Sequence, residues 1–207
     1  MFLNNYPGIP MPPKVKYPKE SVVNAAFQVV RKHGWQGLTA RSIASQLNSS
    51  TNPIYSHLKS MKNLEEEVIK KAIDLFEEYI TRPRIDDKWM DHAFGYLLFA
   101  MNEKHLFKAI HDENHIMLYK KHADQLWEAT GDELSGYPLF KDLAEDTVFK
   151  IRHSRWVYIH GLASLITNSF RFDAVKNDED LIDMIRRASM AIYRGIINDP
   201  DPSGIYS

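Results

Sequence analysis

The segment "SSTNPIYSHLKSMKNL", residues 49–64, combines a proline with apolar residues at helical spacing. Ile54 and Leu58 are one helical turn apart, which predicts a short helix with one buried side. If Ser50 caps this helix, Pro53 falls in the first turn, where backbone amides have no intrahelical partner to lose. Since Ile54 and Leu58 take the buried side, the small polar residues, the tyrosine and the histidine must face outward.

Two further helices are predicted before this segment. Residues 17–35 place valines and alanines on one stripe, and Gly34 supplies a stop signal. Thr39 is a good N-cap for the next helix, "ARSIASQL" at residues 40–47. Asn48 tolerates the left-handed backbone needed for a tight turn. Three short helices with a tight turn before the last predict a helix-turn-helix, whose final helix enters the major groove of DNA.

The charges divide unevenly along the chain, although the net charge of the 207 residues is only −1. Residues 1–62 hold eight basic residues and one acidic residue, which gives +7. The remainder holds 18 basic and 26 acidic residues, which gives −8. Such an asymmetry favours a polyanion-binding module attached to a separate acidic body.

The polar residues of the basic third are the predicted DNA contacts. Thr51 and Asn52 are short groups able to reach base edges, and asparagine suits adenine. Tyr55, His57 and Lys59 carry donors suited to phosphate oxygens. The full predicted DNA-binding set is Lys14, Lys16, Thr39, Arg41, Ser50, Thr51, Asn52, Tyr55, His57, Lys59 and Lys62.

Residues 37–68, "GLTARSIASQLNSSTNPIYSHLKSMKNLEEEV", resemble the DNA-binding domain of TetR/AcrR-type transcriptional regulators. The chain departs from the family pattern at Asn48-Ser49, where the family has Gly-Val, at Leu58 for Phe, and at Met61 for Lys. The residues that match the pattern are Thr39, Ile43, Ala44, Ser50, Ile54, Tyr55, His57 and Leu64. The "RWVYIHGLASL" segment at residues 155–165 is similar to the Trp…His-Gly element of the penultimate helix in many members.

The predicted fold is all-α. Gly and Pro are sparse between residues 19 and 198, and apolar residues recur at three and four. We expect a flexible Pro-rich arm at residues 1–16, a helix-turn-helix head at 17–62, and a multi-helix body at 63–207. The resemblance implies that the body binds a small-molecule effector. The aromatic and Met residues predicted to line its pocket are Phe94, Leu98, Met101, Met117, Trp127 and Trp156.

Two long C-terminal segments, residues 144–170 and 178–198, carry apolar stripes that one chain alone would leave partly exposed. The resemblance assigns them to a homodimer interface. A two-fold protein also suits a palindromic DNA site. The predicted interface residues are Ile159, Leu162, Ile166, Leu181, Ile185, Ala188 and Ile192.

The "HDENH" segment, residues 111–115, allows a different interpretation. His111 and His115 are one helical turn apart, and two such histidines can hold a metal in an enzyme. The order differs from H-E-x-x-H and no third ligand is defined, so solvated histidines are the favoured interpretation and no metal or cofactor is predicted. A pH-sensitive cluster on these residues is a further interpretation.

The sequence therefore predicts a dimeric, ligand-responsive, DNA-binding transcriptional regulator, most simply a repressor, and not an enzyme. The alternative is a helical protein-binding adaptor with a degenerate head, supported by the departures from the family pattern. The absence of Cys excludes disulfides and suits a reducing cytoplasm. No apolar stretch reaches the length of a membrane span.

Overall fold

The computed structural model describes residues 17–51, 54, 61–168 and 175–198. Every regular element in these ranges is a helix, which confirms the predicted all-α class. None of the helices in the described part of the chain combines the length and hydropathy of a membrane span. The predicted arm at residues 1–16 lies outside the described residues.

The head begins with α1 (Lys19–His33), a short 3-10 turn η1 (Trp35–Gly37) and α2 (Ala40–Gln46). Gly34 ends α1 at φ +77°, a conformation that glycine adopts without strain, and its N–H donates to the Val30 carbonyl at 2.8 Å. Thr39 and Ser42 form a reciprocal capping box at the start of α2. Both helix boundaries therefore follow the sequence signals.

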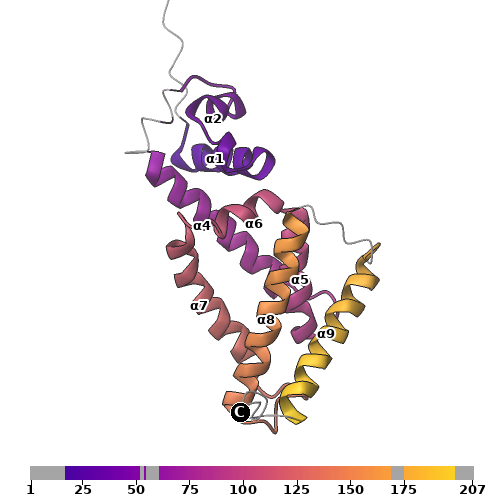
Figure 1. Cartoon of the computed structure of the whole chain (residues 1–207). Coiled ribbons are helices and arrows are strands. Elements are labelled where there is room, and N and C mark those ends of the chain that lie inside the picture. The colour runs from indigo at the N-terminus through magenta and orange to yellow at the C-terminus, as the bar shows by residue number, and fades with distance from the viewer. Residues whose placement is uncertain (1–16, 52–53, 55–60, 169–174, 199–207) are drawn as a thin grey trace, which may run out of the picture.

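The body is built on α4 (Met61–Thr81), which starts beside the head and continues into the body (Figure 1). The following helices are α5 (Lys88–Asn102), α6 (Lys104–Ile110) and α7 (Ile116–Glu133). The last two are α8 (Glu145–Thr167) and α9 (Asp178–Asn198). Figure 1 shows α1 and α2 at one end of the molecule, α6 beneath them, and α7, α8 and α9 extending to the other end.

One hydrophobic core runs without interruption from the head into the body. Val22 and Ile43 of the head, Leu64 and Phe76 of α4, and Phe99 of α5 all belong to it. A smaller cluster around Trp89, Leu134, Phe140 and Ile151 closes the far end. Because the core crosses the predicted boundary between residues 62 and 63, the head is packed on the body.

The helices α4 and α5 cross closely at Gly95. A Cβ on Gly95 would lie 1.9 Å from the Tyr79 carbonyl oxygen, far inside van der Waals contact. The absence of a side chain therefore allows the two backbones to approach, and this crossing fixes α5 against α4.

Candidate nucleic-acid interface and ligand cavity

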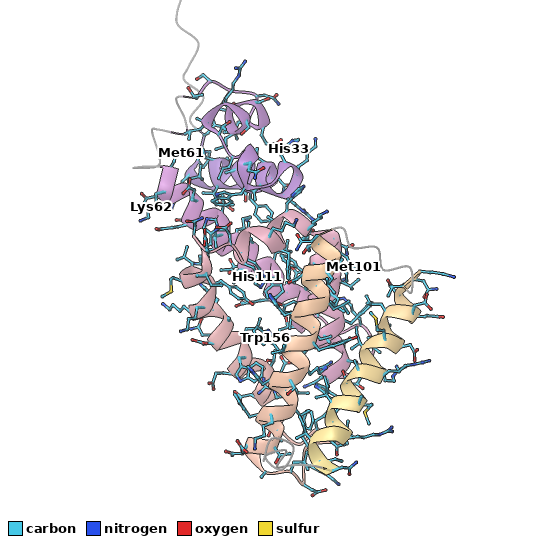
Figure 2. The ribbon with its side chains drawn as sticks, in the orientation of Figure 1. His33, Met61, Lys62, Met101, His111 and Trp156 are labelled. Carbon is cyan, nitrogen blue, oxygen red and sulfur yellow. The ribbon has the colours of Figure 1, made fainter. Side chains whose placement is uncertain are left out.

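The described part of the predicted DNA-binding set lies on the surface of the head and of the first turn of α4. Thr39, Arg41, Ser50, Thr51 and Lys62 are all exposed. Lys62 lies near the start of α4 (Figure 2). The other predicted contacts, Lys14, Lys16, Asn52, Tyr55, His57 and Lys59, lie outside the described residues.

The chain turns sharply after α2. Asn48 has φ +50°, the left-handed value expected for it, and the Ser49 N–H donates to the Ala44 carbonyl at 2.9 Å. Ile54 is then only 1% exposed and belongs to the core that holds Ile43. The segment after the turn is thus anchored against the head, while Ser50 and Thr51 remain exposed.

The head contacts the body through α1 and the turn that follows it. Arg31 Nε donates to Glu103 Oε2 at 2.7 Å, and Arg31 Nη2 also bonds the Glu103 carboxylate. The Trp35 ring meets the His115 ring edge-on at 4.3 Å between centroids. These contacts connect α1 to the start of α6 and η1 to the start of α7, since Glu103 precedes α6 and His115 is the N-cap of α7.

A cavity of about 370 Å³ lies inside the body between α4, α5, α7 and α8. Its apolar wall includes Phe76, Tyr119, Leu126 and Ile159. The volume falls in the range of small-molecule sites in proteins. One of its walls is α4, the helix that continues from the head into the body, and this makes it the candidate ligand site.

Two of the six predicted pocket residues, Trp127 and Trp156, line this cavity. Trp156 lies on α8 in the middle of the body (Figure 2). The other four have different surroundings. Phe94 is buried in the core and Leu98 packs against it, whereas Met101 and Met117 are 42% and 75% exposed.

Two arginines on one face of α8 supply the cavity with positive charge. Arg155 is 6% exposed, and its Nε donates to Ser189 Oγ at 2.8 Å while its Nη2 donates to the Trp89 carbonyl. Arg152 Nη2 donates to the Trp127 carbonyl at 2.6 Å. Burial lowers the pKa of Arg155 to about 9, which still leaves it charged at neutral pH.

Neither arginine is among the pocket residues predicted from the sequence. Arg155 is four residues from Ile151 and from Ile159, two buried members of the α8 stripe. Residues four apart share one face of a helix, so a charged residue in the middle of an apolar stripe is a local signal for an inward-facing arginine.

His92, another residue of the cavity wall, contacts Glu133 through its Nε2 at 2.9 Å. Burial lowers the pKa of His92, and the hydrogen bond to Glu133 opposes that shift. Asp124, which also lines the cavity, and Glu133, the partner of His92, are both exposed.

The "HDENH" residues do not form one helical face, because α6 ends before His111 and α7 begins after His115. His111 Nδ1 lies 2.9 Å from the Phe107 carbonyl, and His115 Nδ1 lies 2.8 Å from the Ala109 carbonyl. The favoured interpretation as solvated histidines is wrong for this pair, since His115 is 7% exposed and His111 is packed among aromatic rings. Among the described residues, no group of three or more His, Asp or Glu is placed to hold a metal.

Four of the predicted dimer residues are buried within the single chain, which corrects their assignment to the interface. Ile159, Leu162, Leu181 and Ile185 are at most 4% exposed and belong to the protomer core. Ile166, Ala188 and Ile192 are half-buried. The sequence pattern marked the buried stripe of each helix, whereas the exposed apolar residues of α8 include Val157, Tyr158 and Leu165.

The chain is similar to two proteins named as uncharacterised HTH-type (helix-turn-helix) transcriptional regulators. It is 19% identical to YobS of Bacillus subtilis (strain 168) over 201 residues, 90% of this chain and 96% of that protein. It is 32% identical to Rv0681 of Mycobacterium tuberculosis over 59 residues, 28% of this chain and 27% of that protein. No protein-family model matches the chain.

These similarities support the prediction of a transcriptional regulator of the helix-turn-helix type. They also agree with the prediction that the chain is not an enzyme, because both relatives are named as regulators. The similarity to YobS extends over nearly the whole length of both proteins, so it includes the body as well as the head.

Proposed function

We propose that this protein is a ligand-responsive transcriptional repressor of the TetR/AcrR type, which binds a palindromic DNA operator as a homodimer in the cytoplasm. The observation that carries the proposal is the head itself. A capped α2, a left-handed turn at Asn48 and the buried Ile54 are arranged as a helix-turn-helix requires. The +7 charge of residues 1–62 supplies the attraction to phosphate.

The proposed dimer interface is the outward face of α8 and α9. Val157, Tyr158 and Leu165 expose apolar area on α8. Gly161 and Gly195 are exposed, and a Cβ at either position would meet no atom of the described chain within 4 Å. A glycine inside a helix costs about 0.5–1 kcal/mol relative to alanine. In the single chain neither glycine allows a close backbone contact. In a dimer, both glycines would let the helices of a second copy approach closely.

The proposed switch couples the cavity to the head through α6. Tyr96 and Tyr119 line the cavity, and the Tyr96 hydroxyl lies 3.4 Å from Nε2 of His111 at the end of α6. Glu103, at the other end of α6, accepts a hydrogen bond from Arg31 of the head. A ligand that displaces either tyrosine would shift α6 and, through it, α1. A near-complete switch requires the ligand to prefer one state by about 5 kcal/mol.

The test is fluorescence anisotropy of the purified protein with DNA from upstream of its own gene, against scrambled DNA, over a series of salt concentrations. We expect specific binding that weakens with salt, because each phosphate contact releases counterions. Arg41→Gln should reduce the salt slope. Arg82→Gln, an equal change of charge at an exposed position after α4, should leave the slope unchanged.

The adaptor alternative makes the opposite prediction. A well-folded dimer that binds neither DNA at low salt would contradict the proposal and favour a protein partner. Equal affinity for the upstream DNA and the scrambled DNA would mean that the protein binds DNA but has no operator beside its own gene.

A further inference from the structure

The charged groups of the cavity are unbalanced. Arg155 is buried, and Arg152 is half-buried on the same face of α8. Neither guanidinium has a carboxylate within ion-pair distance among the described residues. Asp87 acts on Arg155, and Glu128 and Asp132 act on Arg152, only through longer-range attraction. A buried charge without a partner is costly, so this arrangement favours an anion from outside the chain.

The arginines already have their apolar faces covered. The Arg155 guanidinium carbon lies 4.4 Å from the centroid of the Trp89 ring, and that of Arg152 lies 4.1 Å from the centroid of the Trp127 ring. Backbone carbonyls and the hydroxyls of Ser189 and Thr130 accept hydrogen bonds from Nε or Nη2 of these arginines. Stacking fixes both guanidinium planes, so the remaining N–H groups are oriented before a ligand arrives.

A residue of the cavity wall, Trp89, also carries a buried donor without a partner. Trp89 is 2% exposed, and its Nε1 has no hydrogen-bond partner in the part of the chain that the structure describes. A buried indole N–H normally finds an acceptor. Trp89 and Arg155 are in contact, so the donor without a partner lies beside the buried positive charge.

The rest of the wall is apolar and aromatic. Phe76, Tyr119, Leu126 and Trp156 surround the same space as the arginines. A small inorganic anion would satisfy the arginines and leave this apolar surface uncovered. A neutral apolar molecule would cover the surface but leave the arginines without a counter-charge and the Trp89 N–H without an acceptor.

We infer that the cavity binds a small amphipathic carboxylate: an acid group at Arg152 and Arg155, and a flat apolar body against Trp127 and Trp156. This inference rests on the proposed function only in calling the ligand an effector. Carboxylates pair with guanidinium through parallel charge-assisted hydrogen bonds, which gives the site its selectivity for a planar acid.

The probes that test the inference are 2-naphthoate and 2-naphthamide, which have nearly the same shape and differ in charge. Isothermal titration calorimetry of the full chain without DNA measures both affinities. We expect one site per chain and at least tenfold tighter binding of 2-naphthoate. Arg152→Gln should bring the ratio of the two affinities close to one, and Arg155→Gln should do the same if its circular dichroism spectrum is native. Arg82→Gln is the matched control and should keep the ratio of the wild type.

Equal affinity for the two probes, a preference for the amide, or no binding of either would overturn the inference. So would a ratio that Arg152→Gln leaves intact while its fold is unchanged. The titration needs no DNA, so its outcome is independent of the anisotropy test of the proposed function. If 2-naphthoate binds as expected and no DNA is bound, the carboxylate site stands and the regulator proposal fails.

Discussion

Arg31, in the last turn of α1, is bound to Glu103, a carboxylate only 3% exposed at the junction of α5 and α6. The hydrogen bond to Glu103 raises the pKa of Arg31, so its guanidinium is charged throughout the physiological pH range. The head and the body are thus joined by an ion pair whose acidic member is buried and whose basic member is partly exposed. Removing the arginine would leave a buried carboxylate without its counter-charge.

Arg31→Met should therefore lower the free energy of unfolding by about 1–3 kcal/mol, less than for a fully buried pair because solvent screens Arg31. Urea unfolding at neutral pH measures this change in the free energy of unfolding. Lys32→Met, one residue further along the same turn and exposed, is the control and should change stability by less than about 0.5 kcal/mol. Equal effects of the two changes would contradict a role for Glu103 in holding the head.

His111 should make stability depend on pH. Burial lowers its pKa from 6.5 to about 4, while the Phe107 carbonyl opposes this shift and His160 adds to it. The other groups around it are the Tyr96 and Tyr119 phenols, and burial raises the pKa of both. The unfolded chain takes up the proton on His111 more readily than the folded chain. The contribution of His111 to the free energy of unfolding is therefore fully present above pH 6.5 and is lost as the pH falls toward 4.

The loss assigned to His111 over this interval is about 3 kcal/mol at most. His111→Gln should flatten the profile of unfolding free energy measured by urea titration at pH 7, 6 and 5. Gln125→Ala, at an exposed position of α7 that carries no titratable group, should leave the slope as in the wild type. A slope that His111→Gln does not change would show that other groups titrate in this range.

Gly95→Ala should destabilise the body by about 3 kcal/mol, because its new Cβ would collide with the Tyr79 carbonyl and force α4 and α5 apart. Thermal unfolding followed by circular dichroism measures the effect. Lys70→Ala, at an exposed position of α4, is the control and should change stability by less than about 0.5 kcal/mol. A stability close to the wild type in Gly95→Ala would mean that the crossing relaxes without cost.

Leu165→Glu should shift the protein toward monomers, since Leu165 is 43% exposed on the proposed dimer face of α8. A buried and unpaired carboxylate in an interface opposes association. Sedimentation velocity over a range of concentrations measures the change, and circular dichroism checks that the fold is retained. Leu118→Glu, at a similarly exposed leucine on α7, is the control. Identical sedimentation of all three proteins would place the interface elsewhere or exclude it.

Local signals in the sequence predicted the end of α1 and the start of α2 well. The N-cap at Thr39, the stop at Gly34 and the left-handed Asn48 all depend on neighbouring residues, so they can be identified without tertiary structure. The buried stripes of α8 and α9 were also identified. Their assignment to an interface was not correct for the residues that are buried in the single chain. Periodicity shows which side of a helix is apolar, but it does not show whether the same chain covers that side.

The cavity was predicted only in part for a similar reason. Aromatic and Met residues are common to cores, surfaces and pockets, so composition selected Trp127 and Trp156 together with the exposed Met101 and Met117. The arginines that distinguish this cavity come from α8, and the rings they stack on come from α5 and α7. Only the packing of these helices brings them together.

Residue types and short spacings are enough to specify the all-α class, the end of α1, the capped start of α2 and the concentration of positive charge in residues 1–62. The helix boundaries arise from interactions between residues a few positions apart, and the charge is a sum over residue types. Helix packing specifies which apolar stripes are covered, how Arg31 meets Glu103 across 72 residues, and which side chains surround the cavity. Those contacts join helices that are distant in the chain, and no local pattern encodes how such helices pack.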